Sequence, residues 1–366
     1  MIYLDNAATT KIAHEALDAM SVYLTDQYGN ASTFYDLGLR SHNAIDNARH
    51  IIAQTINADD DEIFFTSGGT ESDNWAIKCR PDGYDVVVTS QIEHDAILRS
   101  LPRYSIKAGV LQDGVVDVDQ IKRVVGNNTL VSVMFANNEI GTIQPIPEIA
   151  EIVHKAGGLM HTDAVQAYCH VPIDVKSMKI DLLSASSHKI HGPKGIGFLY
   201  IKKELQKKWS PYITGGHQER GMRAGTENVA SIVGFGAAAK VEYDNLISGG
   251  MDKVANVRDY LEDKILRNIP DVKINGANRL PGNLNVTISN VKAEELLEIL
   301  NEHQIYASSG SACTTGDESP SHVLTAIGLS PDEANATLRF SLDRENTMRE
   351  MNNVVEVLKD GVDLLR

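Results

Sequence analysis

Short hydrophobic runs rich in valine, isoleucine and phenylalanine recur along the first half of the chain, separated by helix-length segments. They cover residues 63–65, 86–88, 130–135, 158–160, 182–183 and 196–201. Continuous rather than alternating hydrophobicity is typical of strands covered on both faces, as in an α/β domain. The last run follows Ser186 after only about nine residues, fewer than a parallel crossover needs. We therefore expect a mostly parallel sheet with one reversed strand.

Helical patterns flank these runs and continue after them. Residues 13–58 predict helices whose apolar positions are Ala16, Met20, Val22, Leu24, Ile45, Ile51 and Ile52. After residue 250 the pattern changes: 254–265 and 293–300 predict amphipathic helices, and 283–288 alternates like a half-exposed strand. Because 366 residues exceed one ordinary core, we expect two domains. They are a large domain over 13–250 and a small α+β domain over 251–366, with segment 1–12 packing on the small one.

Composition narrows the class of protein. The chain has 34 Lys and Arg against 49 Asp and Glu, a formal net charge of −15, which disfavours direct nucleic-acid binding. No apolar run reaches the length of a membrane span, and the start lacks a signal-peptide pattern, so we expect a cytoplasmic protein without a membrane partner. The three cysteines form no Cys-x-x-Cys pair, which argues against a disulfide framework or a thiolate zinc site.

Polar clusters follow each predicted parallel strand. They are residues 66–70, 93–94, 137–139, 161–163 with Gln166, and 186–189. Ligands of open α/β sheets bind outside the carboxyl ends of the strands, so we expect one composite site there. Lys189 stands just past a buried strand, where desolvation would depress the pKa of its amine and favour Schiff-base chemistry with a substrate carbonyl or with pyridoxal phosphate (PLP). The alternative is a lysine in a surface turn.

Four further groups have open roles at this stage. The glycine turn at 67–70 joins a strand to a helix, so it is either a phosphate cradle or an ordinary turn. Asp163 could bind a protonated pyridine nitrogen, a ribose hydroxyl or a metal ion. His94 could be an acid/base, a ring-stacking group or a structural histidine. Arg339 lies between apolar residues and needs a carboxylate, either from a substrate or from an internal salt bridge.

Cys313 differs from the other two cysteines. It lies in a stretch of small residues, 308–320, without helical or strand periodicity, which predicts a mobile, exposed loop. An exposed thiol is prone to oxidation, so its presence suggests use as a nucleophile. Cys79 and Cys169 lie in apolar surroundings and are interpreted as structural.

With these residues in place, the chain resembles the cysteine desulfurases of the NifS/IscS type, class-V aminotransferase-like PLP enzymes of fold type I. The resemblance runs nearly end to end. Its motifs are residues 3–10, 66–74, 137–141, 161–166, 187–189 with 192–195, 220–226 and the segment around Cys313. It implies a homodimer with shared active sites. The segment around Cys313 resembles the long-loop group of the family.

The resemblance also implies residue roles. Lys189 would carry the cofactor and move the substrate Cα proton, while Lys194 would be structural. The other cofactor contacts implied are Asp163 to the pyridine nitrogen, Gln166 to the phenolic oxygen, His94 on the ring, Asn138, a phosphate shell of Gly69, Thr70, Ser186 and His188, and Thr226 from the neighbouring subunit. Asn138 and Arg339 would hold the substrate carboxylate. His94 would take the proton of the substrate thiol, and Cys313 would attack the substrate sulfur.

The implied reaction converts L-cysteine to L-alanine and leaves a persulfide on Cys313. That sulfur would pass to a protein acceptor, either an iron–sulfur scaffold or a tRNA-thiolation protein. The alternatives are a selenocysteine lyase, another class-V PLP aminotransferase or a non-catalytic protein of the same fold. Departures from the family pattern are Ala31 in place of proline, His217 within a glycine stretch, and an end at Arg366 without the extension that some members use to dock a scaffold.

Overall fold

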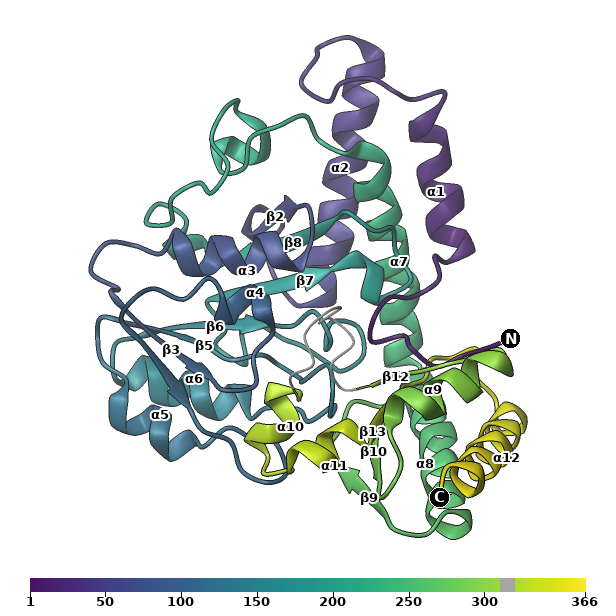
Figure 1. Ribbon diagram of the computed structural model, residues 1–366. Helices are drawn as coiled ribbons and strands as arrows, with labels where there is room; N and C mark the ends of the chain where they lie inside the picture. Colours follow the sequence, from purple (N-terminus) through teal and green to yellow (C-terminus); the bar gives the residue numbers. More distant parts are fainter. Residues whose placement is uncertain (310–319) are drawn as a thin grey trace.

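The computed structural model describes residues 1–309 and 320–366. A seven-stranded sheet lies at its centre in the order β2-β8-β7-β6-β5-β3-β4 (Figure 1). The strands are β2 Ile63–Thr66, β3 Val86–Ser90, β4 Ser105–Ala108, β5 Thr129–Ser132, β6 Leu159–Asp163, β7 Leu182–Ser186 and β8 Gly197–Ile201. β8 is antiparallel to both β2 and β7, and the remaining neighbours are parallel. This confirms the predicted sheet with its reversed strand at 196–201.

Helices cover both faces of this sheet. Successive strand residues belong to different cores: Leu182 packs with Trp75, whereas Leu183 packs with Phe235 on the opposite face. Continuous hydrophobicity in the strands is therefore explained by burial on two sides. The face of Trp75 carries α3 Gly69–Lys78 and α4 Asp95–Leu98; the other carries α2 Asp36–Thr55, α5 Val118–Val124, α6 Ile146–Lys155 and α7 Val229–Ile247, with α1 His14–Leu24 packed on α7.

A second core lies at the lower right of Figure 1, where the N-terminus also lies. It surrounds a four-stranded antiparallel sheet of order β12-β13-β10-β9. The strands are β9 Val272–Asn275, β10 Asn283–Ile288, β12 Ser308–Ser309 and β13 Thr337–Ser341, and the helices are α8 Gly250–Asn268, α9 Ala293–Glu302 and α12 Met348–Leu365. The short helices α10 His322–Ala326 and α11 Pro331–Asn335 pack in a separate small cluster with Ile92, Met134 and Ile140. β1 Ile2–Tyr3 pairs in parallel with β11 Ile305–Tyr306, and Ile2 and Leu4 join this core. The exact domain boundaries stay a prediction.

One strand was not predicted, and one expectation about burial was wrong. β4 was not predicted, because Ile106 and Lys107 are exposed on an edge strand and leave no hydrophobic run. Strand 283–288 was expected to be half-exposed, yet every residue is buried. Its polar side chains are satisfied internally: Asn285 Nδ2, for example, donates to the Glu139 carbonyl at 3.2 Å. On α1, the apolar residue Leu24 is 63% exposed. Among the described residues, no helix has the length and apolarity needed to cross a membrane.

Candidate active site

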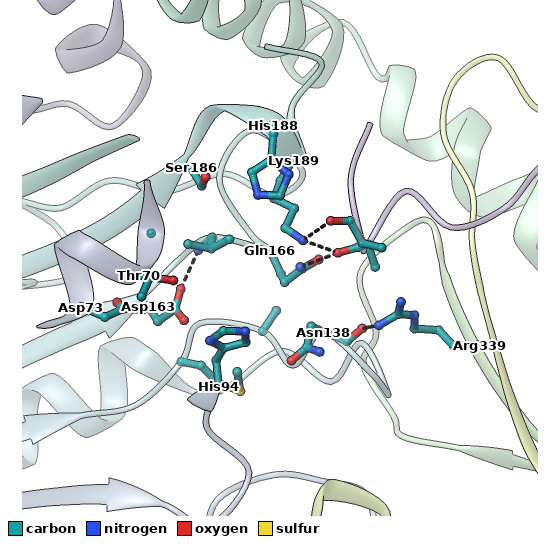
Figure 2. Close-up of a pocket in the computed structure, with 16 residues that line it drawn as sticks. Thr70, Asp73, His94, Asn138, Asp163, Gln166, Ser186, His188, Lys189 and Arg339 are labelled. Atoms are coloured by element: carbon teal, nitrogen blue, oxygen red, sulfur yellow. Dashed lines mark hydrogen bonds between the residues drawn. The ribbon is translucent and has the colours of Figure 1, made fainter. Parts of the chain in front are cut away.

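A cavity of about 280 Å³ opens at the carboxyl ends of the central strands (Figure 2). It brings together most of the residues singled out in the sequence: Gly69, Thr70, His94, Asn138, Asp163, Gln166, Ser186, His188, Lys189 and Arg339. Sequence reasoning missed six further lining residues, Ala7, Ala8, Asp73, Met134, Ala136 and Val165. Across residues 1–309 and 320–366, no group of three or more His, Cys, Asp and Glu side chains could hold a metal ion.

Lys189 points its amine into this cavity from the short 3₁₀ turn Ser187–Lys189 that follows β7. Its Nζ donates to the carbonyl oxygens of Ala7 and Ala8, at 2.5 and 2.7 Å. Gln166 Nε2 donates to the same Ala7 oxygen at 3.0 Å. The N-terminal segment therefore holds the lysine and the glutamine side by side, and the side chain of Lys189 is only half-buried. The amine is not in a surface turn.

Asp163 ends β6 and is almost fully buried in the cavity wall. Its Oδ1 accepts a hydrogen bond from the Val165 amide at 2.9 Å, which fixes the direction of the carboxyl group. Burial raises the pKa of Asp163, while the bond from Val165 and the charge of Lys189 work in the opposite direction. A buried carboxylate that faces the cavity suits a cationic partner.

His94 lies across the cavity from Gln166 in Figure 2 and caps the N-terminus of α4. Its Nδ1 accepts a hydrogen bond from the Ala96 amide at 3.0 Å. An amide can only donate, so Nδ1 is unprotonated in this arrangement and a neutral ring carries its proton on Nε2. His94 can therefore stack on or donate to a ligand as it stands, whereas taking a proton on Nδ1 requires the cap bond to open.

A second opening of about 360 Å³ lies beside the first, at the N-terminus of α3. It is lined by Thr9, Ser67, Gly68, Gly69, Thr70, Glu71, Ser186, His188, Lys194 and Gly195. A Cβ on Gly69 would lie 2.5 Å from Val165 Cγ2, so only glycine fits this close approach. The free amides at a helix start attract an anion.

The acidic side chain beside this turn is paired with an arginine. Glu71 would repel an anion, but it is bound by Arg223, whose Nε lies 2.9 Å from Glu71 Oε1. Although burial raises it, the pKa of Glu71 is held below its ordinary value by hydrogen bonds from Arg223 and Ser67. Burial, with the nearby charges of Lys189 and Lys194, lowers the pKa of His188 to about 4. His188 is therefore a neutral hydrogen-bonding group at physiological pH.

Arg339 reaches the cavity from β13 of the second core and is almost fully buried. Nη1 donates to the Asn138 carbonyl at 3.0 Å and Nη2 to Asp5 Oδ1 at 2.8 Å. Nε has no hydrogen-bond partner among the described residues. The internal salt bridge considered from the sequence therefore exists.

Two predicted residues are not among those that line the cavity. Thr226 is exposed, in the segment between the 3₁₀ turn Gln218–Gly221 and α7, and its predicted place in a neighbouring subunit's phosphate shell stays a prediction. Cys313 lies outside the described residues. Cys169 is buried as expected, and Cys79 is partly exposed.

The family model described as Aminotransferase class-V matches residues 2–354. The cysteine desulfurase IscS of Methanosarcina thermophila is 45% identical over 378 residues, covering 100% of this chain and 93% of that protein. The chain belongs to the cysteine desulfurases of the class-V aminotransferase family. This identification confirms the resemblance found in the sequence, and the protein is an enzyme of that family.

Solved structures agree with this cysteine desulfurase assignment. A NifS-like protein from Rickettsia africae ESF-5 has a TM-score of 0.90 at 34% identity, covering 99% of each chain. SspA, solved in complex with cysteine, has a TM-score of 0.82 at 34% identity, covering 95% of this chain and 100% of that one. The expected fold, a mostly parallel sheet of PLP fold type I with a smaller α+β part, is confirmed.

Proposed function

We propose that the protein is a PLP-dependent enzyme that converts L-cysteine to L-alanine and passes the sulfur to a protein acceptor through a persulfide on Cys313. The supporting observation is the meeting of Lys189, Asp163 and Gln166 in one cavity, beside a glycine-rich helix start. This arrangement occurs in a chain that is 45% identical to an IscS cysteine desulfurase.

The residues fit PLP group by group. Lys189 offers an amine to the aldehyde, and Asp163 offers a buried carboxylate to the ring nitrogen. The start of α3 at Gly69, which lines the second opening, suits the phosphate. When bound, PLP supplies an electron sink for charge that develops at the substrate Cα.

The remaining side chains would bind the substrate carboxylate and accept its protons. Arg339 and Asn138, which both line the cavity, would hold the carboxylate, so that the Cα–H bond faces Lys189 and its proton can move to Nζ. His94 would take the thiol proton at Nδ1, exchanging its bond from Ala96 for that proton. Opening the cap of α4 is therefore part of this role.

Sulfur transfer would then occur at Cys313. Its thiolate attacks the substrate sulfur, an S–S bond forms as the substrate C–S bond breaks, and the electron pair of that bond stays on carbon. The enzyme keeps the persulfide, and alanine forms when Cβ takes up a proton and Cα regains the proton that Lys189 removed. A thiol with an ordinary pKa near 8.5 is only a few per cent thiolate at neutral pH, so this step needs local activation.

The test is Cys313→Ala. We expect this variant to keep the bound chromophore but lose release of sulfide from L-cysteine in the presence of a thiol reductant. Cys79→Ala is the matched control and should retain both. Unchanged sulfide release in Cys313→Ala would overturn the role of Cys313. Turnover of selenocysteine but not cysteine by that variant would favour a selenocysteine lyase, and transfer of the amino group to a keto acid would favour an aminotransferase.

We also propose that the enzyme is a homodimer. Large exposed apolar side chains gather on α1, on α2 and on the segment between them: Leu17, Leu24, Tyr28, Phe34, Tyr35 and Leu39. Phe34 is 94% exposed, and such a concentration is typical of a protein interface. Phe34→Glu combined with Tyr35→Glu should give monomers in analytical ultracentrifugation. A variant that stays dimeric would contradict this choice of surface.

The acceptor is proposed to be a protein in the cytoplasm, either an iron–sulfur scaffold or a tRNA-thiolation protein. Cys79 and Cys169 are both free thiols, as expected in a reducing compartment. The net charge of −15 would suit an acceptor with a basic patch. Capture of persulfide-carrying proteins during turnover of isotope-labelled cysteine would identify the acceptor. Transfer only to free reductant would contradict a protein acceptor.

A further inference from the structure

Asn138 and Arg339, the two side chains proposed to hold the substrate carboxylate, come from different parts of the fold. Asn138 lies in the segment that follows β5 of the central sheet, whereas Arg339 lies on β13 of the four-stranded sheet. Both line the cavity, and Arg339 Nη1 donates to the Asn138 carbonyl oxygen at 3.0 Å (Figure 2). The distance between the two side chains therefore depends on how the segment with Asn138 is held against the second core.

A second contact between the same two elements of the fold lies beside the first. The carbonyl oxygen of Glu139 accepts hydrogen bonds from Asn285 Nδ2 at 3.2 Å and from Asn283 Nδ2 at 3.3 Å. Both asparagines lie on β10, and Asn285 is the direct cross-strand neighbour of Arg339. Neighbouring side chains of the small sheet therefore bind two consecutive carbonyls, those of residues 138 and 139.

We propose that Asn285 is a positioning residue for the substrate carboxylate. By binding Glu139, it fixes the segment that carries Asn138 and so sets the spacing between Asn138 and Arg339. Asn285 is not among the residues that line the cavity, so it acts on a ligand only through these two side chains. This role rests on the proposed function, because it requires a substrate with a carboxylate.

Burial makes the amide donor of Asn285 important. Asn285 is 0% exposed and Glu139 is 6% exposed, so water cannot readily replace a bond lost between them. The direction of the amide is fixed from the other side, because Asn285 Oδ1 accepts from Asn275 Nδ2 at 2.8 Å. An amide whose oxygen is used in this way presents its nitrogen to Glu139, where only a donor satisfies the carbonyl.

The segment with Asn138 is also held from its own side, by Asn137. Its Oδ1 accepts from the amides of Glu139 and Ile140 at 2.8 and 3.0 Å, and its Nδ2 donates to the Ile92 carbonyl at 3.0 Å. These bonds remain when Asn285 is replaced. The substitution should therefore shift the segment relative to the second core without unfolding it.

The experiment compares L-alanine and ethylamine, which differ only in the carboxylate, as ligands of the full-length, PLP-loaded enzyme. Their dissociation constants are measured from the absorbance of the bound chromophore. In Asn285→Ala, we expect binding of L-alanine to weaken about tenfold, the effect of one lost buried hydrogen bond, and binding of ethylamine to stay unchanged. A general structural effect would weaken binding of both ligands.

Thr337→Val is the matched control, because it removes a buried hydroxyl from the same strand as Arg339. The partners of that hydroxyl are Thr287 Oγ1 and the Glu333 carbonyl, at 2.7 and 2.6 Å. The control should leave both dissociation constants unchanged. Asn285→Thr serves as a second variant if Asn285→Ala does not fold, since threonine suits a strand but lacks the amide donor.

Three results would contradict the proposal. If L-alanine binds to the Asn285 variant as tightly as to the wild type, or if binding of both ligands weakens equally, Asn285 does not position the carboxylate site. If the wild type itself binds ethylamine as tightly as L-alanine, the carboxylate site proposed for Arg339 and Asn138 is wrong, and the role of Asn285 with it. The wild-type comparison thus separates a failure of the proposed function from a failure of this inference.

Discussion

Lys189 Nζ donates a hydrogen bond to the Ala8 carbonyl oxygen at 2.7 Å, which ties the amine to the N-terminal segment. That segment begins as β1, paired with β11 of the second core. Ala7 and Ala8 near the start of the chain and Arg339 near its end therefore line the same cavity as Lys189, which lies at the carboxyl ends of the central strands. Lys189 is held by backbone carbonyls that no side-chain substitution removes.

Lys189→Ala should abolish the covalent attachment of PLP, because no other amine is held at this position. We expect borohydride reduction and peptide mass spectrometry to find the adduct on Lys189 in the wild type and no adduct in the variant. Lys189→Arg can keep the bonds to Ala7 and Ala8 but cannot form the linkage, so it should also lack the adduct. Lys194→Ala is the matched control and should keep it. An adduct on Lys194 in Lys189→Ala would contradict the assignment.

Arg339→Lys should weaken binding of the substrate more than it slows turnover. Lysine keeps a charge but loses the planar donor fork, and one charged hydrogen bond is worth about 1.5–3 kcal/mol, or roughly 10- to 150-fold in KM. Steady-state kinetics with L-cysteine provide the measurement. Asp5→Asn is the control, because it removes the internal partner of Arg339 without removing the guanidinium, and its KM should not rise comparably. Equal effects of both substitutions would indicate that Arg339 serves only the salt bridge.

Much of this site could be predicted because the carboxyl ends of parallel strands lie at the same edge of the sheet. Asp163 and Lys189 follow hydrophobic runs directly, so their meeting follows from sheet topology. Asp73 carries no comparable signal. It lies in a helix among polar residues, and only the packing of α3 on the sheet places it in the cavity wall. The contact of Lys189 with Ala7 and Ala8 could not be predicted either, because every residue has a backbone carbonyl and the sequence does not show which one will accept a bond.

In the fold too, some elements could be predicted from the sequence and others could not. Runs such as 182–183 are detectable because both faces are buried, whereas β4 lies at the edge and exposes Ile106, so it shows no run. The strand at 283–288 alternates in polarity, which suggested solvent on one face. Instead, Asn275 Nδ2 donates to Asn285 Oδ1 and to Thr287 Oγ1, each at 2.8 Å, so buried amides and hydroxyls satisfy one another. Polarity alone cannot distinguish such a network from exposure.

Glu93→Gln should flatten the pH dependence of stability. Burial raises the pKa of Glu93 to about 8, and Ser90 and the Met134 amide only partly oppose this shift. Between the ordinary value of 4.5 and about 8, the folded protein therefore holds a proton that the unfolded chain has lost. Each pH unit in that window reduces the free energy of unfolding by about 1.4 kcal/mol, an effect that glutamine cannot show.

Urea unfolding of the cofactor-free wild type and of Glu93→Gln, at several pH values from 5 to 8, provides the measurement. The stability of the variant relative to the wild type should rise steadily with pH. Glu139, whose pKa burial raises to about 7, is present in both proteins and contributes equally. Parallel curves for the two proteins would show that Glu93 is already ionised in the fold.

Arg49→Met should destabilise the protein by about 3–5 kcal/mol, because it leaves the buried Glu219 without its cation. Arg49 Nη1 and Nη2 lie 2.7 and 2.8 Å from the two Glu219 carboxylate oxygens, and both side chains are almost fully buried. Combining Arg49→Met with Glu219→Leu also removes the unpaired buried carboxylate. The double variant should therefore recover part of the lost free energy of unfolding, measured in urea. Full recovery is not expected, since the Phe65 amide also donates to Glu219, at 2.9 Å, and would lose its acceptor. A double variant less stable than Arg49→Met would show that Glu219 acts mainly through that amide.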